Sequence, residues 1–161
     1  MRLLKASAMW LTVLASVMVV GCSIETTEPT EVEIQVIEEL DFAPSLGIDL
    51  AAMQLTGTGV YIQDVTVGEG EPVTSGDQIW IAYQGWLYTG TRFDAGEFNF
   101  RLGEGLVIQG FDQGIEGMRL GGKRRMVIPP ELAYGTQGVG SIPPGSVLVF
   151  EVDLLNVAPG G

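Results

Sequence analysis

Between Val60 and Val157 the chain is divided into short runs of alternating apolar and polar residues that end at glycine or proline. Alternation with a period of two gives a β-strand one buried and one exposed face, so each run predicts a strand. The five predicted strands cover residues 60–67, 78–87, 98–102, 124–128 and 147–157.

One segment has the period of a helix instead. Its apolar residues are spaced three, four and three apart along one helical face: Ile108, Phe111, Ile115 and Met118. Asp112 and Glu116 fall on the opposite side, where we expect solvent. Strands in this number with one short helix predict an α+β fold, a mainly antiparallel sheet with the helix across its face.

The N-terminus predicts a signal peptide over residues 1–21. Arg2 and Lys5 precede an uncharged run, residues 6–20, and then Gly21 and Cys22. The run is shorter than the roughly 20 apolar residues of a comfortable membrane span. Residues 19–22 resemble the bacterial lipobox, whose cysteine is lipidated and becomes the mature N-terminus. The alternative is an ordinary cleaved signal followed by an unrelated cysteine.

Residues 22–52 are predicted to form a lipidated, acidic and flexible tether, with the folded domain at 53–161. Eight acidic residues and no Lys or Arg lie between Ser23 and Ala52, which disfavours a packed core. A second possibility stays open, a short strand or helical turn that docks on the domain. It would use the apolar side chains of this segment: Val32, Ile34, Val36, Ile37 and Leu40.

The charge balance restricts the partners. The formal net charge is −12 at pH 7, and removal of the signal leaves six basic and twenty acidic side chains. Such a surface repels nucleic acids and anionic lipid headgroups. We therefore expect no nucleic-acid partner, and membrane attachment only through the lipid on Cys22.

The composition also limits the chemistry. The chain has no histidine and Cys22 is its only cysteine, which excludes Ser-His-Asp and Cys-His catalysis, ordinary zinc sites and an intrachain disulfide. No phosphate-binding loop of the Walker type is present. We expect neither a metal nor a cofactor. The basic run at residues 123–125 is interpreted as a solvated strand edge.

The remaining candidates for a functional site are apolar and aromatic residues, which are concentrated in residues 103–145. Val107, Ile108 and Phe111 are followed by Tyr134 and Ile142 in a segment without a nucleophile beside a base. Taken singly, each has an ordinary place in a core. Together they predict an apolar, aromatic-lined hollow that desolvates a small hydrophobic group, for which a prolyl side chain is the candidate.

From about Gly59 to Val157 the chain resembles an FKBP-type peptidyl-prolyl isomerase domain. The matching segments keep their order and approximate spacing: residues 83–85, 90–94, 98–103, 107–111, 114–118, 128–130, 133–135, 142–144 and 148–152. The resemblance implies a twisted antiparallel sheet of about five strands wrapped around a short helix, with the pocket between them.

The resemblance also implies the site residues. The catalytic set is Tyr83, Asp94, Phe111, Tyr134 and Phe150, and the substrate-binding set is Phe93, Phe98, Val107, Ile108 and Ile142. Phe111 would form the floor under the proline ring. The Ile108 N–H and the Tyr134 hydroxyl would hold substrate carbonyls, and Asp94 would lie near Tyr83 and polarise the site.

Three departures from the family's best-known members stand out. Phe111 replaces a tryptophan, and Val139 lies at a loop position where histidine is frequent. Only three residues separate Asp94 from Phe98, which predicts a shorter loop between them. The last two departures are expected to affect substrate preference and rate.

The resulting hypothesis is a monomeric, lipid-anchored prolyl isomerase that faces the periplasm or the cell exterior and assists the folding of exported proteins. Its partners would be proline-containing polypeptides and macrolide inhibitors. The alternative is a folding-helper or binding module with the same fold and little turnover. The short stretch from Gly135 to Ile142 leaves no room for the large client-binding insertion that would favour the alternative.

Overall fold

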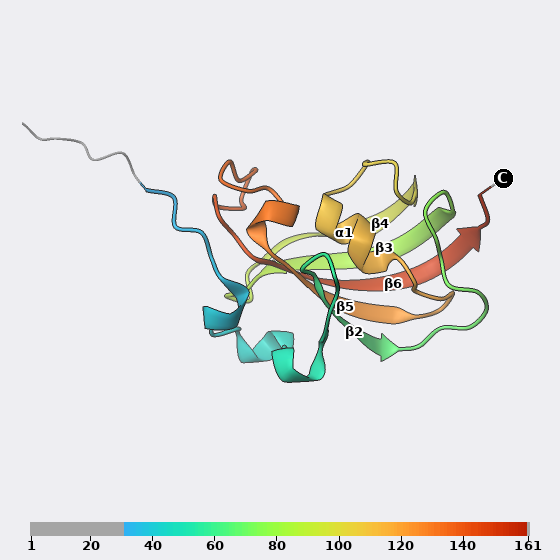
Figure 1. Cartoon of the computed structure of the whole chain (residues 1–161), viewed down its shortest axis with the longest axis horizontal. Coiled ribbons are helices and arrows are strands. Elements are labelled where there is room, and N and C mark those ends of the chain that lie inside the picture. The colour runs from blue at the N-terminus through green and yellow to red at the C-terminus, as the bar shows by residue number, and fades with distance from the viewer. Residues whose placement is uncertain (1–30, 161) are drawn as a thin grey trace, which may run out of the picture. The chain divides into compact units, whose positions relative to one another are not determined.

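The computed structural model describes residues 31–160, in which six strands form one antiparallel sheet (Figure 1). The strands, in spatial order, are β1 (Gln54–Leu55), β2 (Tyr61–Thr66), β5 (Lys123–Ile128), β6 (Leu148–Ala158), β3 (Gln78–Leu87) and β4 (Arg92–Arg101). The only α-helix among these residues, α1 (Gln109–Ile115), lies across one face of the sheet. The predicted α+β class is confirmed, with six strands instead of about five, because β1 is a two-residue strand that no alternation reveals.

Strand β4 is the element that differs most from its prediction. It begins at Arg92, six residues earlier than the alternation indicates, and pairs with β3 from Arg92 to Arg101, interrupted only by a bulge at Phe93. Residues 94–98 are therefore continuous strand, and the loop predicted between Asp94 and Phe98 does not exist. The small residues Ala95 and Gly96 concealed the strand, since they give no apolar alternation.

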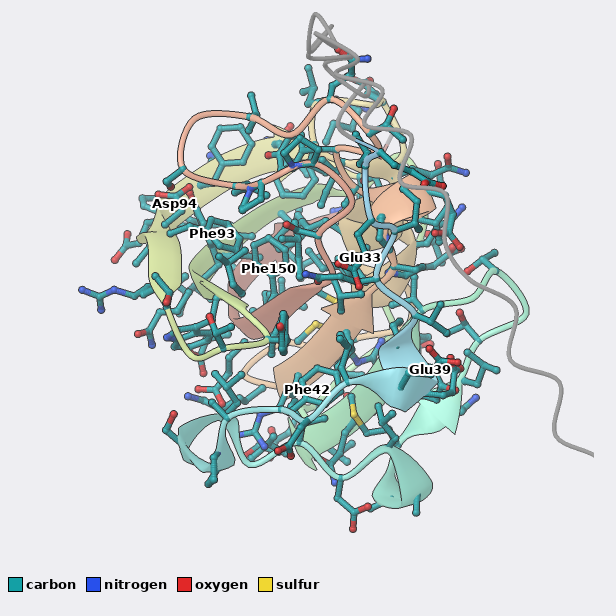
Figure 2. All side chains as sticks on the ribbon, turned by 90° about the vertical axis from the view of Figure 1, so that its left-hand side faces the viewer. Glu33, Glu39, Phe42, Phe93, Asp94 and Phe150 are labelled. Carbon is teal, nitrogen blue, oxygen red and sulfur yellow. The ribbon has the colours of Figure 1, made fainter. Side chains whose placement is uncertain are left out.

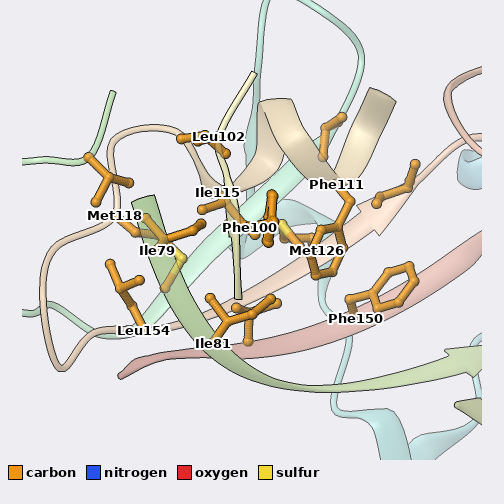
Figure 3. Close-up of a cluster of buried hydrophobic side chains, with 14 of the residues drawn as sticks. Ile79, Ile81, Phe100, Leu102, Phe111, Ile115, Met118, Met126, Phe150 and Leu154 are labelled. Carbon is orange, nitrogen blue, oxygen red and sulfur yellow. The ribbon is translucent and has the colours of Figure 1, made fainter. Parts of the chain in front are cut away.

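The main core fills the space between α1 and the sheet (Figure 3). Of the predicted helical face, Phe111, Ile115 and Met118 are buried in it, whereas Ile108 is half-buried at its margin. Alternate residues of β3 and β6 supply other buried side chains: Ile79, Ile81, Leu148, Phe150, Val152 and Leu154. The helix itself stops at Ile115, and Gly117 follows with a φ of 81°, so Met118 reaches the core from the turn after the helix.

Two glycines allow α1 to lie directly on β5. A Cβ on Gly110 would come within 2.3 Å of Ile128 Cγ2, and one on Gly114 within 2.3 Å of Met126 Sδ. Residues four apart share a helix face, so both glycines point at the strand. Glycine costs helix stability but permits this close approach, which holds Phe111 against the sheet.

The opposite face of the sheet is covered by residues 37–53, which form the 3₁₀ turns η1 (Ile37–Glu39), η2 (Pro44–Leu46) and η3 (Leu50–Ala52) (Figure 1). The buried side chains of this second core come from the segment, from the outer faces of β5 and β6 and from the residue just before β6: Ile37, Leu46, Met53, Val127, Val149 and Val147. The prediction of a flexible tether up to residue 52 is wrong for residues 37–52, which dock on the domain. Of the five residues that the docking alternative named, only Ile37 and Leu40 join this core, whereas Val32, Ile34 and Val36 are exposed. The burial of apolar side chains spaced among the acidic ones stabilises the docked segment more than the repulsion between the acidic side chains destabilises it.

The basic run at residues 123–125 is not a solvated edge, because β5 lies between β2 and β6. Arg124 is only 4% exposed. Its Nε and Nη2 donate to the two carboxylate oxygens of Asp64 at 2.7 and 3.0 Å, and its Nη1 donates to the carbonyls of Gly114 and Glu116. Arg124 thus ties the C-terminal end of α1 to β2 and β5, where a cation also suits the helix dipole.

The predicted signal peptide (residues 1–21) and lipidation site (Cys22) lie outside the described residues. Within residues 31–160, no helix has both the length and the apolar character needed to cross a membrane.

Candidate functional site

A cavity of about 210 Å³ opens between α1 and the inner face of β3, β4 and β6. Nine of the ten predicted pocket residues line it: Tyr83, Phe93, Asp94, Phe98, Val107, Ile108, Phe111, Tyr134 and Phe150. They come from three strands, the first turn of α1 and two loops, so only the folded chain brings them together.

Edge-to-face aromatic contacts build the cavity wall. Phe111 is buried on α1, and its ring centroid lies 4.9 Å from that of Phe150 and 6.1 Å from that of Tyr83, at steep interplanar angles. Phe93 meets Phe150 at 5.5 Å and 85°. Such contacts stabilise one arrangement of the rings. The result is a preformed apolar wall with Phe111 at its base.

A bulge in β4 explains how two consecutive side chains face the same cavity. The register pairs Asp94 with Gly85 and Arg92 with Trp86, which leaves Phe93 without a partner on β3. In a bulge two residues oppose one, and the usual alternation of faces is interrupted. Phe93 and Asp94 therefore both line the cavity. Figure 2 labels them close together, near Phe150, at the end of the domain that faces the viewer.

The polar pair of the site is Tyr83 and Asp94. The Tyr83 hydroxyl donates to Asp94 Oδ2 at 2.8 Å, and the Ala95 N–H donates to Oδ1 at 2.9 Å. Burial, together with the Asp94 hydrogen bond and charge and the nearby Tyr134, raises the pKa of Tyr83 to about 12. Tyr83 is thus a neutral donor at physiological pH, and its bond fixes the Asp94 carboxylate.

The backbone before α1 offers a hydrogen-bond donor to the cavity. Ile108 has the extended conformation of a helix N-cap, and its carbonyl accepts from the N–H groups of Phe111 and Asp112. Among the hydrogen bonds within residues 31–160, none uses the Ile108 N–H. This arrangement suits the predicted contact with a substrate carbonyl.

Three residues differ from the predicted lining. Ile142 is 7% exposed and belongs to the core beside the cavity, so it does not line the pocket as predicted. Ile81 and Leu106 line it in addition. Ile81 had a sequence signal, since it alternates with Tyr83 on the same strand face. Leu106 is 61% exposed beside Val107 and had none.

The described residues offer no candidate metal centre. Nowhere in residues 31–160 do three or more His, Cys, Asp or Glu side chains gather in a way that could hold an ion. The site combines an apolar wall, one phenol–carboxylate pair and a backbone donor. Such a set can bind, desolvate and polarise a small group, but it has no side chain poised for covalent chemistry.

Comparison with known proteins gives a consistent result. The family model of FKBP-type peptidyl-prolyl cis-trans isomerases matches residues 69–155. An FK506-binding protein of Neisseria meningitidis serogroup B is 44% identical over 105 residues, which cover 62% of this chain and 96% of the relative. The crystal structure of FkpA from Escherichia coli superposes with a TM-score of 0.63 and 41% identity, covering 68% of this chain and 53% of that one.

The chain spans only about a quarter of the longer fungal relatives. FK506-binding protein 4 of Gibberella zeae is 42% identical over 121 residues, which are 73% of this chain and 23% of the relative. The shared part is thus one domain, the part that carries the cavity. By the family match and the near-complete coverage of the Neisseria protein, this chain belongs to the FKBP-type peptidyl-prolyl cis-trans isomerase family.

Proposed function

We propose that this protein catalyses cis–trans isomerisation of X-Pro bonds in exported polypeptides and so assists their folding. The observation that carries the proposal is the cavity of about 210 Å³ with Phe111 at its base and the Tyr83–Asp94 pair at its side. A prolyl ring is small and apolar enough to pack against such a wall. Rotation about the amide bond that precedes it is slow and needs a catalyst.

The energetics need no covalent step. Rotation about a peptide bond has a barrier of about 18–20 kcal/mol, because resonance gives the C–N bond partial double-bond character. The planar amide is more polar than the twisted one, so a dry aromatic wall disfavours the planar state relative to the twisted state. Preorganised contacts to the rotated carbonyl add to this difference. An acceleration of about 10⁴ requires only about 5.5 kcal/mol.

Each side chain then has a physical task. Phe111, Phe93 and Phe150 surround the prolyl ring and exclude water. The Ile108 N–H and the Tyr134 hydroxyl hold substrate carbonyls on either side of the ring. Asp94, oriented by Tyr83, provides a fixed negative charge near the rotating amide and transfers no proton.

The proposal includes export and a lipid anchor at Cys22. The signal pattern of residues 1–21 and the lipobox-like residues 19–22 support it. Within residues 31–160, the first hydrogen bond from the N-terminal residues to a loop of the domain is the one from the Gln35 N–H to the Gly145 carbonyl. Twelve residues separate Cys22 from Gln35, a length that can extend to at most about 40 Å.

The proposed partners are unfolded, proline-containing clients and macrolides of the FK506 type, in line with the relatives, which are FK506-binding proteins. The strongly acidic surface supports a monomer that does not bind nucleic acids.

The function is tested with a short X-Pro peptide, whose relaxation from cis to trans is followed with and without the protein. The proposal predicts acceleration that a macrolide of this class suppresses. Delayed folding of a proline-rich client without faster peptide exchange would instead indicate a binding module. The absence of both effects would refute both functions.

The anchor has a separate test. Growth of the producing bacterium with a labelled fatty acid should label the wild type but not Cys22→Ser. The variant should also leave the membrane fraction. Equal labelling of both proteins would contradict lipidation at Cys22.

A further inference from the structure

The loop that carries Tyr134 closes at a narrow neck. It joins η4 (Pro130–Leu132) to β6, and the Gly145 N–H donates to the Gly135 carbonyl at 2.7 Å across its base. Gly135 directly follows Tyr134 in the chain. The position of Gly145 therefore fixes the backbone on which the Tyr134 side chain is mounted.

Gln35 binds this neck on both sides of Ser146. The Gln35 N–H donates to the Gly145 carbonyl at 3.0 Å, and the Val147 N–H donates to Gln35 Oε1 at 2.8 Å. Val147 is fully buried, so water cannot replace the amide oxygen as its acceptor. Gln35 thus holds two backbone positions of the loop, Gly145 through its own backbone N–H and Val147 through its half-buried side chain, from a place 112 residues earlier than Val147.

The backbone of the same segment touches Gly145. This glycine has a φ of 73°, and a Cβ there would come within 2.3 Å of the Glu33 carbonyl oxygen. Any side chain at this position would push residues 33–35 off the loop. Figure 2 labels Glu33 on this N-terminal segment, in the view of the end that carries Phe93, Asp94 and Phe150.

The segment does not depend on Gln35 to stay docked. Ile37 and Leu46 are 5% and 7% exposed in the core on the outer face of the sheet. The Ala43 N–H donates to the Tyr88 carbonyl, and Arg125 Nη1 donates to the Gly47 carbonyl. A change at Gln35 should therefore act on the loop neck and leave the second core intact.

We propose that Gln35 is a positioning residue of the prolyl site, which acts through Gly145 and Gly135 on Tyr134. The inference rests on the proposed isomerase function and adds to it. Residues 33–35, which were predicted from the charge of their segment to belong to a tether, would then help to position the residues that line the cavity. Its effect should fall on substrate binding, because the proposed task of Tyr134 is to hold a substrate carbonyl.

The first test compares Gln35→Met with Gln35→Glu in the full chain. Methionine keeps the length of the side chain but removes the acceptor for the Val147 N–H, whereas glutamate retains it. We expect Gln35→Met to raise KM for an X-Pro peptide about threefold to tenfold at unchanged kcat. Gln35→Glu and the exposed control Glu39→Ala should behave as the wild type.

A double-mutant cycle identifies the route of the effect. If Gln35 acts through Tyr134, adding Gln35→Met to Tyr134→Phe should cost little beyond Tyr134→Phe alone. Fully additive losses would overturn the proposal, as would equal KM values for Gln35→Met and the wild type.

Amide hydrogen exchange gives a readout that does not depend on activity, and its wild-type part requires no variant. In the wild type the Val147 N–H should exchange as slowly as those of central β6, and in a folded Gln35→Met about tenfold faster. Rapid exchange of Val147 in the wild type would overturn the proposal. If the wild type were inactive but its Val147 N–H exchanged slowly, the isomerase function would be refuted, whereas the contact between Gln35 and Val147 would be supported.

Discussion

Phe93 and Phe150 meet edge to face over Gly85, with ring centroids 5.5 Å apart. Phe150 is the direct cross-strand partner of Gly85 on β6, and Phe93 sits in the bulge of β4 on its other side. A Cβ on Gly85 would come within 2.6 Å of Phe93 Cζ and 2.8 Å of Phe150 Cε1. The missing side chain is therefore what allows this wall of the cavity to form.

Gly85→Ala should displace one or both rings and lower kcat/KM for an X-Pro peptide by about 10- to 100-fold. The matched control is Gly96→Ala on β4, where a Cβ would make only ordinary contacts with Tyr83 at 3.9 Å. Steady-state kinetics on both variants check the prediction, with circular dichroism melting to verify folding. Equal losses in the two variants would show that the effect is not specific to the rings.

Asp94→Ala should also reduce kcat/KM, by about 10- to 100-fold, because it removes the charged acceptor of the Tyr83 hydroxyl. Glu97→Ala provides the control. Glu97 lies three residues further along β4, and its carboxylate accepts from Trp80 Nε1, away from the cavity lining. Wild-type activity of Asp94→Ala would contradict its assignment to the site.

The Tyr83–Asp94 bond also predicts an alkaline transition. Tyr83 has a folded-state pKa of about 12 against an ordinary value of 10.0, so the folded state retains the proton longer than the unfolded chain does. Its contribution to stability is fully present below about pH 10 and is lost as the pH rises toward 12. Urea unfolding over this range should therefore give a falling free energy, with a shallower slope for Tyr83→Phe. The comparison between variants is needed because the Glu38 hydrogen bond raises the pKa of Tyr61 as well.

The Arg124 contacts predict a large and localised loss of stability. Arg124→Met should lower the free energy of unfolding by about 3 kcal/mol, because Asp64 and two carbonyls at the end of α1 lose their donor. Lys123→Met removes a partly exposed ion-pairing residue next in sequence and should cost at most about 1 kcal/mol. Urea titration of both variants measures the difference, and equal costs would contradict the structural role of Arg124.

The outcomes for particular residues show what a sequence can reveal. The inner face of β6 was predicted closely, because Phe150 and Val152 alternate with the acidic Glu151 and Asp153. Strand β3 was predicted with its exact bounds, because its apolar and aromatic run ends at the turn that follows Leu87. The pocket residues followed from the resemblance to the FKBP family, whose motifs this chain keeps in order and approximate spacing. Ile142 was misplaced, because motif position does not determine on which side of a loop a side chain packs.

The wrong predictions for Arg124 and for residues 37–52 have one cause in common. Arg124 carries a charge, and its burial depends on Asp64 on β2 and on carbonyls of α1, partners that no local pattern identifies. Residues 37–52 are acidic, so local composition concealed apolar contacts made with β5 and β6. Both errors concern contacts between segments far apart in the chain, where local periodicity carries no information.

The central claim is that the cavity lowers the barrier to prolyl rotation through its environment, without proton transfer by a side chain. The most direct test is NMR exchange spectroscopy on an X-Pro peptide with catalytic amounts of the full chain from pH 6 to 9. The chain has no histidine, so the account predicts accelerated cis–trans exchange with a nearly flat pH profile. No acceleration, or a bell-shaped profile within this range, would contradict it.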